Sequence, residues 1–425
     1  MKKQKKHQMR VVRILVVLTC LLPVIGLATA VGQEPNENSE NTLRVISRTT
    51  DPSVTSPLRK IDTVIQVGSD ARNRFTMHRV YKMGQHARRD HRGSIILLPP
   101  LLGNFGTYML NENGDVTQSL AAKLALANYT VYGYSPRTTG LPPNPCSTGA
   151  FDCSVMRDWS WSQAVLPDID YIRRSVARDY PHEKPAIGGL SRGGMLGVAA
   201  VNAHPTAYSG LLLWDAILYS ADPTVVAFNT VTCAGHTANL AAGNYFNEFL
   251  PALVKRVTPI SEAASIQFFG NPAPGLGTPT FIQLVPNNTR TAYEFASYAR
   301  LLDFVAGLNN VEAVAGLRDS SCSFAGDRTF TSNLENFTGP IFAIKQGRGF
   351  GTYMGDTINL TRSRNVRVQD NPAFGHLDAY MTPNHATYIE GPILDWLDSD
   401  VFPDNENDED DDSDENNEAV GPEEL

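Results

Sequence analysis

The sequence has 425 residues, of which 42% are hydrophobic, so the chain is long enough to bury a sizeable core. Its formal net charge is −8, and the lack of a basic cluster beyond the first 13 residues excludes a nucleic-acid partner. An α/β protein of this length can still form a single domain, and we therefore expect one large domain with appendages.

The first 30 residues have the pattern of a secretory signal peptide. Six basic side chains lie within residues 1–13, an apolar run covers residues 14–28, and Ala28-Thr29-Ala30 fits a cleavage site. The apolar run is near the lower length limit of a spanning helix, so an uncleaved anchor is the alternative. We expect cleavage after residue 30 and a secreted or periplasmic protein with no stable insertion in the membrane.

The five cysteines fit an oxidising compartment. Cys20 lies in the apolar run and is removed with the signal peptide, and an even set of four remains. Three pairings are possible. We favour Cys146 with Cys153, which closes a short loop, and Cys233 with Cys322, which joins distant parts of one insertion. No Cys-x-x-Cys or His-x-x-x-His spacing is present, so no zinc site is expected.

Residues 31–58 are polar and rich in Asn and Glu, which predicts a flexible N-terminal linker. Two strands at the edge of a sheet are expected after it, at residues 62–67 and 75–81. The next apolar run, at residues 94–98, is continuous rather than alternating. Continuous runs are typical of strands that are buried on both faces of a parallel sheet.

Strands and helices then alternate along the chain. We expect further strands at residues 129–134, 186–190 and 208–214. Helices are expected at residues 121–127, after Pro167, and directly after the 186–190 strand. This alternation predicts a doubly wound, mostly parallel α/β sheet.

The pattern changes after residue 217. Residues 218–336 combine helical segments, such as 244–257 and 292–305, with loops rich in Gly and Pro, and we expect them to form a cap inserted between late core strands. The core then comprises residues 59–217 and 337–400, with strands at 341–344 and 366–368 and a closing helix near 386–397. Residues 401–425 are an acidic tail that we expect to be disordered and solvated.

One motif stands out in the predicted core. Gly189-x-Ser191-x-Gly193 lies between a buried strand and a helix rich in small residues. This is the nucleophile-elbow pattern, in which a serine occupies strained backbone at a sharp turn and the glycines let strand and helix approach closely. An ordinary glycine-rich turn is the alternative interpretation.

A nucleophilic serine needs a base and an acid that orients the base. His376 follows the last short strand, where the base falls when the chain order is Ser, acid, His. Our first candidate for the acid is Asp356, which follows the 341–344 strand. Asp215, directly after the 208–214 strand, is the main alternative. Two weaker candidates for the acid are Asp370 and Asp378.

Acyl transfer through a serine also needs two N–H donors for the oxyanion. One is expected from Arg192, the residue after the nucleophile. The other is expected after the 94–98 strand, where Pro99 and Pro100 have no N–H, so Leu101 is the first available donor. Residues 102–104 could supply this donor instead.

These motifs together resemble the α/β-hydrolase superfamily, and most closely the lipase branch that includes the acid lipases. The resemblance extends over about residues 59–400. It implies that Ser191 is the nucleophile, His376 the base, and Leu101 with Arg192 the oxyanion hole. The segments that carry it are 189–193, 129–139 with Ser135-Pro136-Arg137, 158–162, 166–170 and 375–378. The usual His-Gly is Pro99-Pro100 here, and residues 347–351 replace the usual signal after the acid strand.

The sequence thus predicts an exported serine hydrolase that cleaves small-molecule or lipid carboxylic esters, with an apolar acyl group under the cap. This chemistry needs no metal and no organic cofactor. A peptidase or amidase with the same residues is the first alternative. The second is a catalytically inactive binding protein of this fold, and the presence of Ser191, His376 and an available acid argues against it.

Overall fold

In the computed structural model, part of the chain can be described in detail. The described residues are 43–84, 90–110, 115–147, 152–270, 280–284 and 292–403. The predicted signal peptide, residues 31–42 of the predicted linker and residues 404–425 of the predicted tail lie outside them and remain predictions. The tail was predicted to begin at residue 401, but Val401 ends a helical turn and Phe402 packs against the apolar core beside Tyr129. Within the described ranges, no helix has the length and hydrophobicity needed to span a bilayer.

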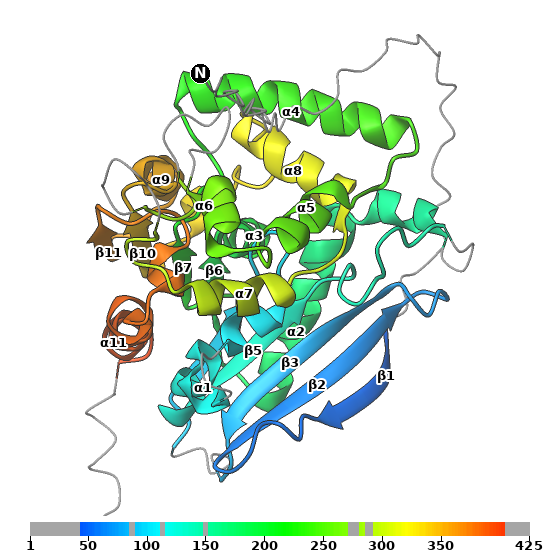
Figure 1. The fold of residues 1–425 in the computed structure, drawn as a ribbon. Helices are drawn as coiled ribbons and strands as arrows, with labels where there is room; N and C mark the ends of the chain where they lie inside the picture. The colour runs from blue at the N-terminus through cyan, green and yellow to red at the C-terminus, as the bar shows by residue number, and fades with distance from the viewer. Residues whose placement is uncertain are drawn as a thin grey trace, which may run out of the picture.

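A nine-stranded sheet forms the centre of the molecule (Figure 1). Its spatial order is β1-β2-β3-β5-β4-β6-β7-β10-β11. The strands are β1 (Leu43–Thr50), β2 (Leu58–Val67), β3 (Arg74–Lys82), β4 (Gly93–Leu97), β5 (Tyr129–Ser135), β6 (Ala186–Leu190), β7 (Gly210–Trp214), β10 (Ile341–Gln346) and β11 (Val366–Asn371). All pairs from β5 to β11 are parallel, and β1, β2 and β3 add antiparallel pairs at one edge. The predicted mostly parallel sheet is confirmed.

Helices cover both faces of the sheet, and its central strands are therefore buried on both sides. Side chains alternate across a strand, so Ile95 and Leu97 enter one apolar core while Ile96 and Leu98 enter the other. The first core includes side chains of α1 (Leu120–Leu126) and α11 (Gly391–Trp396). The second includes side chains of α2 (Leu166–Asp179) and α3 (Arg192–Ala203). The short helices α9 (Met354–Ile358) and α10 (Asp378–Met381) complete the core after β10.

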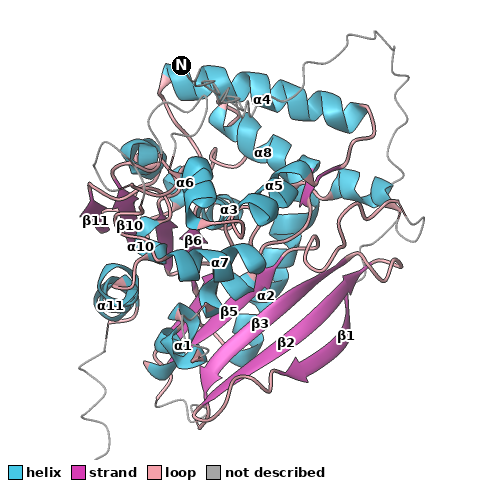
Figure 2. Cartoon of the chain, in the orientation of Figure 1, coloured by secondary structure: helices cyan, strands magenta, loops and turns pink. Residues whose placement is uncertain are grey.

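The N-terminal edge differs from the prediction. We expected residues 31–58 to be a flexible linker, but Leu43–Thr50 form β1, which pairs antiparallel with β2 (Figure 2). Only Leu43 in this strand is partly buried, and the side chains from Arg44 to Thr50 are exposed. Backbone hydrogen bonds to β2 therefore hold the strand in place, and its side chains give no apolar periodicity from which to predict it.

A group of helices connects β7 to β10, where we predicted the cap. They are α4 (Pro223–Ala241), α5 (Phe249–Val257), α6 (Glu262–Phe269), α7 (Tyr298–Ala306) and α8 (Val314–Phe324), with the short strands β8 (Phe246–Asn247) and β9 (Glu312–Ala313). The helices predicted at 244–257 and 292–305 are thus shorter at their N-terminal ends. In Figure 1, α4 and α8 lie together at one end of the molecule.

Both favoured disulfides are present. Cys146 is bonded to Cys153, and Cys233 is bonded to Cys322. The second bond joins α4 to α8, so it lies entirely within the helices between β7 and β10.

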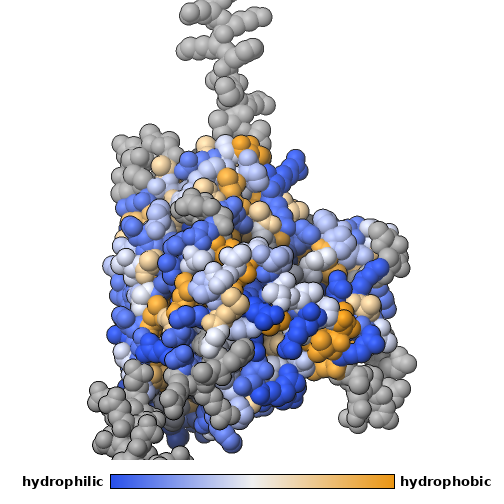
Figure 3. Space-filling view, turned by 90° about the horizontal axis from the view of Figure 1, so that it is seen from below, coloured by the Kyte–Doolittle hydropathy of each residue, from blue (hydrophilic) through white to orange (hydrophobic). Residues whose placement is uncertain are grey.

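The surface seen from below is mostly hydrophilic, with hydrophobic residues scattered in small groups (Figure 3). Scattered apolar side chains of this kind are normal on a protein surface.

Candidate active site

Three of the predicted site residues follow neighbouring strands of the sheet. Ser191 comes directly after β6, Asp215 directly after β7, and His376 follows β11. These strands and β10 are parallel and adjacent in the order β6-β7-β10-β11. The carboxyl ends of parallel strands lie at one edge of a sheet, which is where open α/β sheets bind their ligands.

Ser191 occupies a sharp turn between β6 and α3. Its φ is 56° and its ψ is −122°, a region that residues other than glycine seldom adopt. The Ser191 N–H donates to the Trp214 carbonyl at 2.9 Å, which fixes the turn against the end of β7. The strand, turn and helix thus have the structural context that a nucleophile elbow requires.

The two elbow glycines make room for the loop after β4. A Cβ atom on Gly189 would lie 2.3 Å from the Leu98 carbonyl oxygen, and one on Gly193 would lie 1.9 Å from it. Real Cβ contacts with backbone are never this short, so neither position can hold a larger residue without moving the loop. The glycines therefore bring the predicted oxyanion loop against the serine turn.

His376 is paired with Asp215. Its Nδ1 lies 2.6 Å from Asp215 Oδ2, and both side chains are almost fully buried. The carboxylate also accepts N–H bonds from Gln346 at 3.1 Å and from Phe350 at 2.9 Å. Because a carboxylate only accepts, Nδ1 of His376 carries the proton in this pair, and in the neutral tautomer Nε2 is then the acceptor that a base requires.

The expectation that Asp356 pairs with His376 is wrong. Asp356 lies on α9, and its carboxylate accepts the Ala221 N–H at 2.8 Å and the Ser220 hydroxyl at 3.2 Å. Its hydrogen bonds therefore fasten the segment after β7 to α9, and the alternative Asp215 takes the place beside the histidine.

The loop after β10 explains why Asp215, rather than Asp356, lies beside His376. A Cβ atom on Gly349 would lie 2.1 Å from Asp215 Oδ2, so glycine is needed there for the carboxylate to fit. The next residue, Phe350, donates its N–H to the same oxygen. Residues 347–351 replace the family's usual signal after this strand. They thus surround the carboxylate of Asp215, the residue that directly follows β7.

The weaker candidates have other partners. Asp370 forms an exposed ion pair with Lys345 at 3.3 Å. Asp378 is buried, and its Oδ2 accepts N–H bonds from Gly375 at 2.6 Å and from Gln283 at 2.9 Å. Burial is the largest influence on this carboxyl, and with the nearby Glu294 charge it raises the pKa of Asp378 to about 7 against the lowering effect of the two N–H donors. Asp378 therefore joins the histidine loop to residues 280–284.

This raised pKa predicts a dependence of stability on pH. Because the folded-state pKa of Asp378 lies above its unfolded value, the folded state binds the extra proton between about pH 4 and pH 7. Its contribution to the free energy of unfolding is complete below that window and is lost as the pH rises through it, by up to roughly 1.4 kcal/mol per pH unit. Denaturant unfolding of Asp378→Asn across this window should lack this component, and a slope unchanged from the wild type would contradict the prediction.

The residues predicted to donate to the oxyanion both belong to the lining of the cavity beside Ser191. Leu101 and Arg192 line it, and neither backbone N–H has a hydrogen-bond acceptor within the described residues. The loop that carries Leu101 is held from the cap, since Asn309 donates its N–H to the Leu102 carbonyl at 2.7 Å and its side-chain amide to the Gly103 carbonyl at 2.9 Å. Within the described residues, both N–H groups thus lack a protein acceptor, as the predicted role requires.

Sequence reasoning missed Tyr108, which joins the two halves of this arrangement. Its hydroxyl donates to the Leu98 carbonyl at 2.5 Å and accepts the Leu190 N–H at 2.9 Å. It thereby ties the oxyanion loop to the last residue before Ser191. Its partners are backbone atoms, so no residue pattern in the sequence could have indicated them.

The Arg192 side chain links the elbow to the cap. It forms an ion pair of 2.5 Å with Glu312 on β9, and both side chains are less than a tenth exposed. Two further polar atoms of this pair, Arg192 Nε and Glu312 Oε2, have no hydrogen-bond partner among the residues that the structure describes. Removing either charge would therefore leave the other buried without a counter-charge, which would destabilise the folded protein.

Two of the segments that carry the family resemblance are also joined by a buried ion pair. Arg137, from Ser135-Pro136-Arg137, donates through two nitrogens to the buried carboxylate of Asp168 on α2, at 2.6 and 3.0 Å. A planar guanidinium matches a carboxylate in this two-point geometry. These motif residues support the scaffold around the site.

A second Ser-His-Asp set occurs away from the elbow. His78 Nδ1 lies 2.7 Å from Asp62 Oδ1, and its Nε2 lies 2.7 Å from Ser135 Oγ. Burial lowers the pKa of His78 against the opposing effect of Asp62, which favours the neutral ring. Ser135 is buried and accepts the Phe105 N–H at 3.1 Å, and the His78 ring stacks on the Phe105 ring. Both ring nitrogens of His78 and the Ser135 hydroxyl thus bind protein groups. We infer that this network holds residues 105–109 in position.

A cavity of about 160 Å³ lies beside Ser191. Its lining is mostly apolar and comes from both the core and the cap. The lining residues are Leu101, Ser191, Arg192, Met195, Asp215, Ala216, Ile217, Val225, Phe228, Asn229, Ser320, Phe324, Phe350 and Tyr353.

The fold is the α/β-hydrolase fold. A mostly parallel sheet with helices on both faces carries a serine elbow after one strand and a His-Asp pair at the same edge. The resemblance inferred from the sequence is thus confirmed at the level of the fold, and solved structures support it.

One similar structure is a candidate lipase from Sulfolobus solfataricus, which is 16% identical, with 83% of this chain and 99% of that chain covered and a TM-score of 0.57. Another is a highly thermostable carboxyl esterase from Bacillus coagulans, 13% identical, with 82% and 100% covered and a TM-score of 0.51. A bromoperoxidase from Bacillus anthracis is 15% identical, with 83% and 99% covered and a TM-score of 0.44. No protein-family model and no curated protein matches the chain.

Proposed function

We propose that this protein is a serine hydrolase that cleaves carboxylic esters, with Ser191 as nucleophile, His376 as base and Asp215 as the acid that orients the base. The observation that carries the proposal is the buried 2.6 Å contact between His376 Nδ1 and Asp215 Oδ2, at the sheet edge where Ser191 occupies its strained turn. Similarity to a candidate lipase and to a carboxyl esterase agrees with ester substrates.

In this mechanism, His376 Nε2 takes the proton from Ser191 Oγ as that oxygen attacks the ester carbonyl carbon. The negative charge that develops on the carbonyl oxygen is stabilised by the N–H groups of Leu101 and Arg192. His376 then gives its proton to the leaving alcohol, and an acyl-enzyme remains on Ser191. A water molecule activated by His376 attacks that acyl group, and the acid is released with Ser191 restored.

We also propose that the protein acts outside the cytoplasm. The predicted signal peptide and the pairing of four cysteines in two disulfides both support export. Ester substrates would then be small molecules or lipids of the exterior or the periplasm.

The direct test compares Ser191→Ala with Ser135→Ala, since both serines belong to a Ser-His-Asp set. A fluorophosphonate probe and p-nitrophenyl butyrate report covalent reactivity and turnover of the purified chain. We expect Ser191→Ala to lose both signals and Ser135→Ala to keep them with a lower melting temperature, because Ser135 Oγ accepts the buried Phe105 N–H.

Three other results would redirect the proposal. Loss of both signals in Ser135→Ala alone would move the nucleophile to the second set. Labelling of Ser191 with turnover of anilides but not of esters would favour the peptidase or amidase. A wild-type protein that is neither labelled nor active would favour a binding protein of this fold.

A further inference from the structure

The cap supplies one wall of the cavity beside Ser191. Helix α4 contributes Val225, Phe228 and Asn229, and helix α8 contributes Ser320 and Phe324. The volume of about 160 Å³ is close to that of an apolar protein cavity of roughly 150 Å³ that binds benzene. The sheltered space in this half-open pocket therefore matches about six carbon atoms.

The wall offers mainly hydrocarbon to a ligand, with Asn229 and Ser320 as its polar side chains. The Asn229 side-chain amide donates to the Val225 carbonyl at 2.8 Å, within the same helix turn. One of its two N–H donors is thus used within the helix, while Val225, Phe228 and Phe324 present apolar surface. An unbranched acyl chain fits such a lining, because each methylene gains free energy by leaving water.

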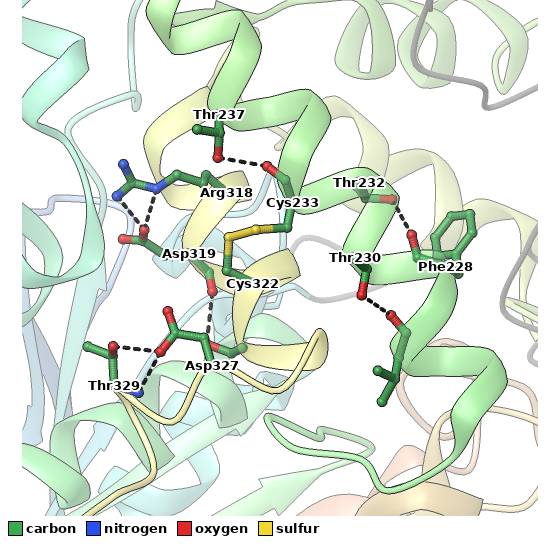
Figure 4. Close-up of a disulfide and its surroundings, with 12 residues drawn as sticks. Phe228, Thr230, Thr232, Cys233, Thr237, Arg318, Asp319, Cys322, Asp327 and Thr329 are labelled. Atoms are coloured by element: carbon green, nitrogen blue, oxygen red, sulfur yellow. Dashed lines mark hydrogen bonds and ion pairs between the residues drawn. A yellow bond between two sulfur atoms is a disulfide. The ribbon is translucent and has the colours of Figure 1, made fainter.

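Helix α4 has few attachments of its own. Its described side-chain hydrogen bonds run to its own backbone four residues back, as from Thr230 to Val226, from Thr232 to Phe228 and from Thr237 to Cys233 (Figure 4). Between Pro223 and Ala241 it contains no Asp, Glu, Lys or Arg, so it can form no ion pair of that kind. Apolar packing and one covalent bond hold this helix.

That bond joins α4 to a helix fixed on the core. Cys233 is bonded to Cys322, two residues from each of the cavity residues Ser320 and Phe324. Helix α8 is fixed because Asp319 Oδ2 accepts the Trp161 N–H at 2.6 Å, and Asp319 also binds Arg318 (Figure 4). Asn229 and Cys233 are four residues apart and share one face of α4, so the disulfide sets how far the wall lies from Ser191.

We propose that Cys233–Cys322 fixes α4 as the wall of a short acyl pocket, and that the substrates are esters of acyl chains of up to about six carbons. This inference rests on the proposed function, since it takes Ser191 as the nucleophile. It adds to that function a substrate class, short-chain esters, and names α4 as the element that limits the acyl length.

A series of p-nitrophenyl esters from acetate to palmitate tests the size limit. We expect kcat/KM to be highest at butyrate or hexanoate and at least about tenfold lower at dodecanoate, since a filled pocket rejects each added methylene. Dodecanoate turnover that equals hexanoate turnover, with Ser191-dependent activity retained, overturns the pocket and leaves the ester hydrolase standing. No turnover of any ester overturns both proposals.

Variants then test the wall. Phe228→Ala and the double variant Cys233→Ser/Cys322→Ser should each raise the ratio of dodecanoate to hexanoate kcat/KM by about tenfold, because both allow a longer chain to fit. Phe249→Ala is the matched control for loss of a ring, since Phe249 is 66% exposed and lies outside the cavity lining. The control for loss of a disulfide is Cys146→Ser/Cys153→Ser, and both controls should leave the ratio within about twofold.

Reduction provides a second route if the double serine variant fails to fold. In the Cys146→Ser/Cys153→Ser protein only the α4–α8 bond remains to be reduced. A phosphine reductant should then raise the same ratio. An unchanged ratio in Phe228→Ala and in the reduced protein, with both still folded by circular dichroism, overturns the proposal.

Discussion

Asp215→Asn is expected to lower kcat/KM for p-nitrophenyl butyrate by about 10⁴-fold, the scale on which a serine triad responds to this change. The Asp215 carboxylate accepts from His376 Nδ1 at 2.6 Å, which keeps the proton on Nδ1. An asparagine amide can present its NH₂ group to the ring, and the proton then moves to Nε2, where the base must be free. Steady-state kinetics of the folded variant measure this effect.

Asp356→Asn is the matched control. Its carboxylate binds Ala221 and Ser220 rather than the histidine, so we expect kcat/KM to stay within about threefold of the wild type. The Phe350 N–H also loses a charged acceptor in Asp215→Asn, so its melting temperature must be recorded beside its kinetics. A loss of activity in Asp356→Asn, with activity kept in Asp215→Asn, would restore the first assignment made from the sequence.

The central fold could be predicted because its signals are local. Strands β4, β6 and β7 are continuous apolar runs, and every residue in them is buried. The elbow could be predicted for the same reason, since strand, turn and helix occupy one short segment around Ser191. By contrast, β1 is held by its backbone partner β2 and exposes nearly all its side chains, so its residues carry no matching signal.

The acid of the site could not be chosen from the sequence because the choice depends on contacts between strands. Asp215 and Asp356 both follow core strands and both precede His376, so chain order permits either. The decision lies in the loop after β10, where Gly349 leaves space for one carboxylate oxygen and Phe350 donates to it. Tyr108 and Asn309 escaped prediction for a similar reason, since Tyr108 binds the distant Leu190 N–H and Asn309 binds the distant Gly103 carbonyl.

A second large effect is expected at the junction of elbow and cap. Glu312→Gln should lower the free energy of unfolding by about 3–5 kcal/mol, because it leaves the buried Arg192 guanidinium without its counter-charge. The ion pair measures 2.5 Å, and its two side chains are 7% and 5% exposed. Denaturant unfolding followed by tryptophan fluorescence measures this loss.

The exposed pair Arg362–Glu335 supplies the control, since its side chains are 69% and 63% exposed and 3.8 Å apart. Glu335→Gln should change the unfolding free energy by less than about 1 kcal/mol. Replacing both members of the buried pair, as Arg192→Leu/Glu312→Leu, should recover most of the lost free energy of unfolding, because neither position then holds an unpaired charge. That double variant should also keep ester turnover, since the proposed oxyanion donor at position 192 is the backbone N–H. A folded double variant without turnover would instead assign the Arg192 side chain a role in catalysis.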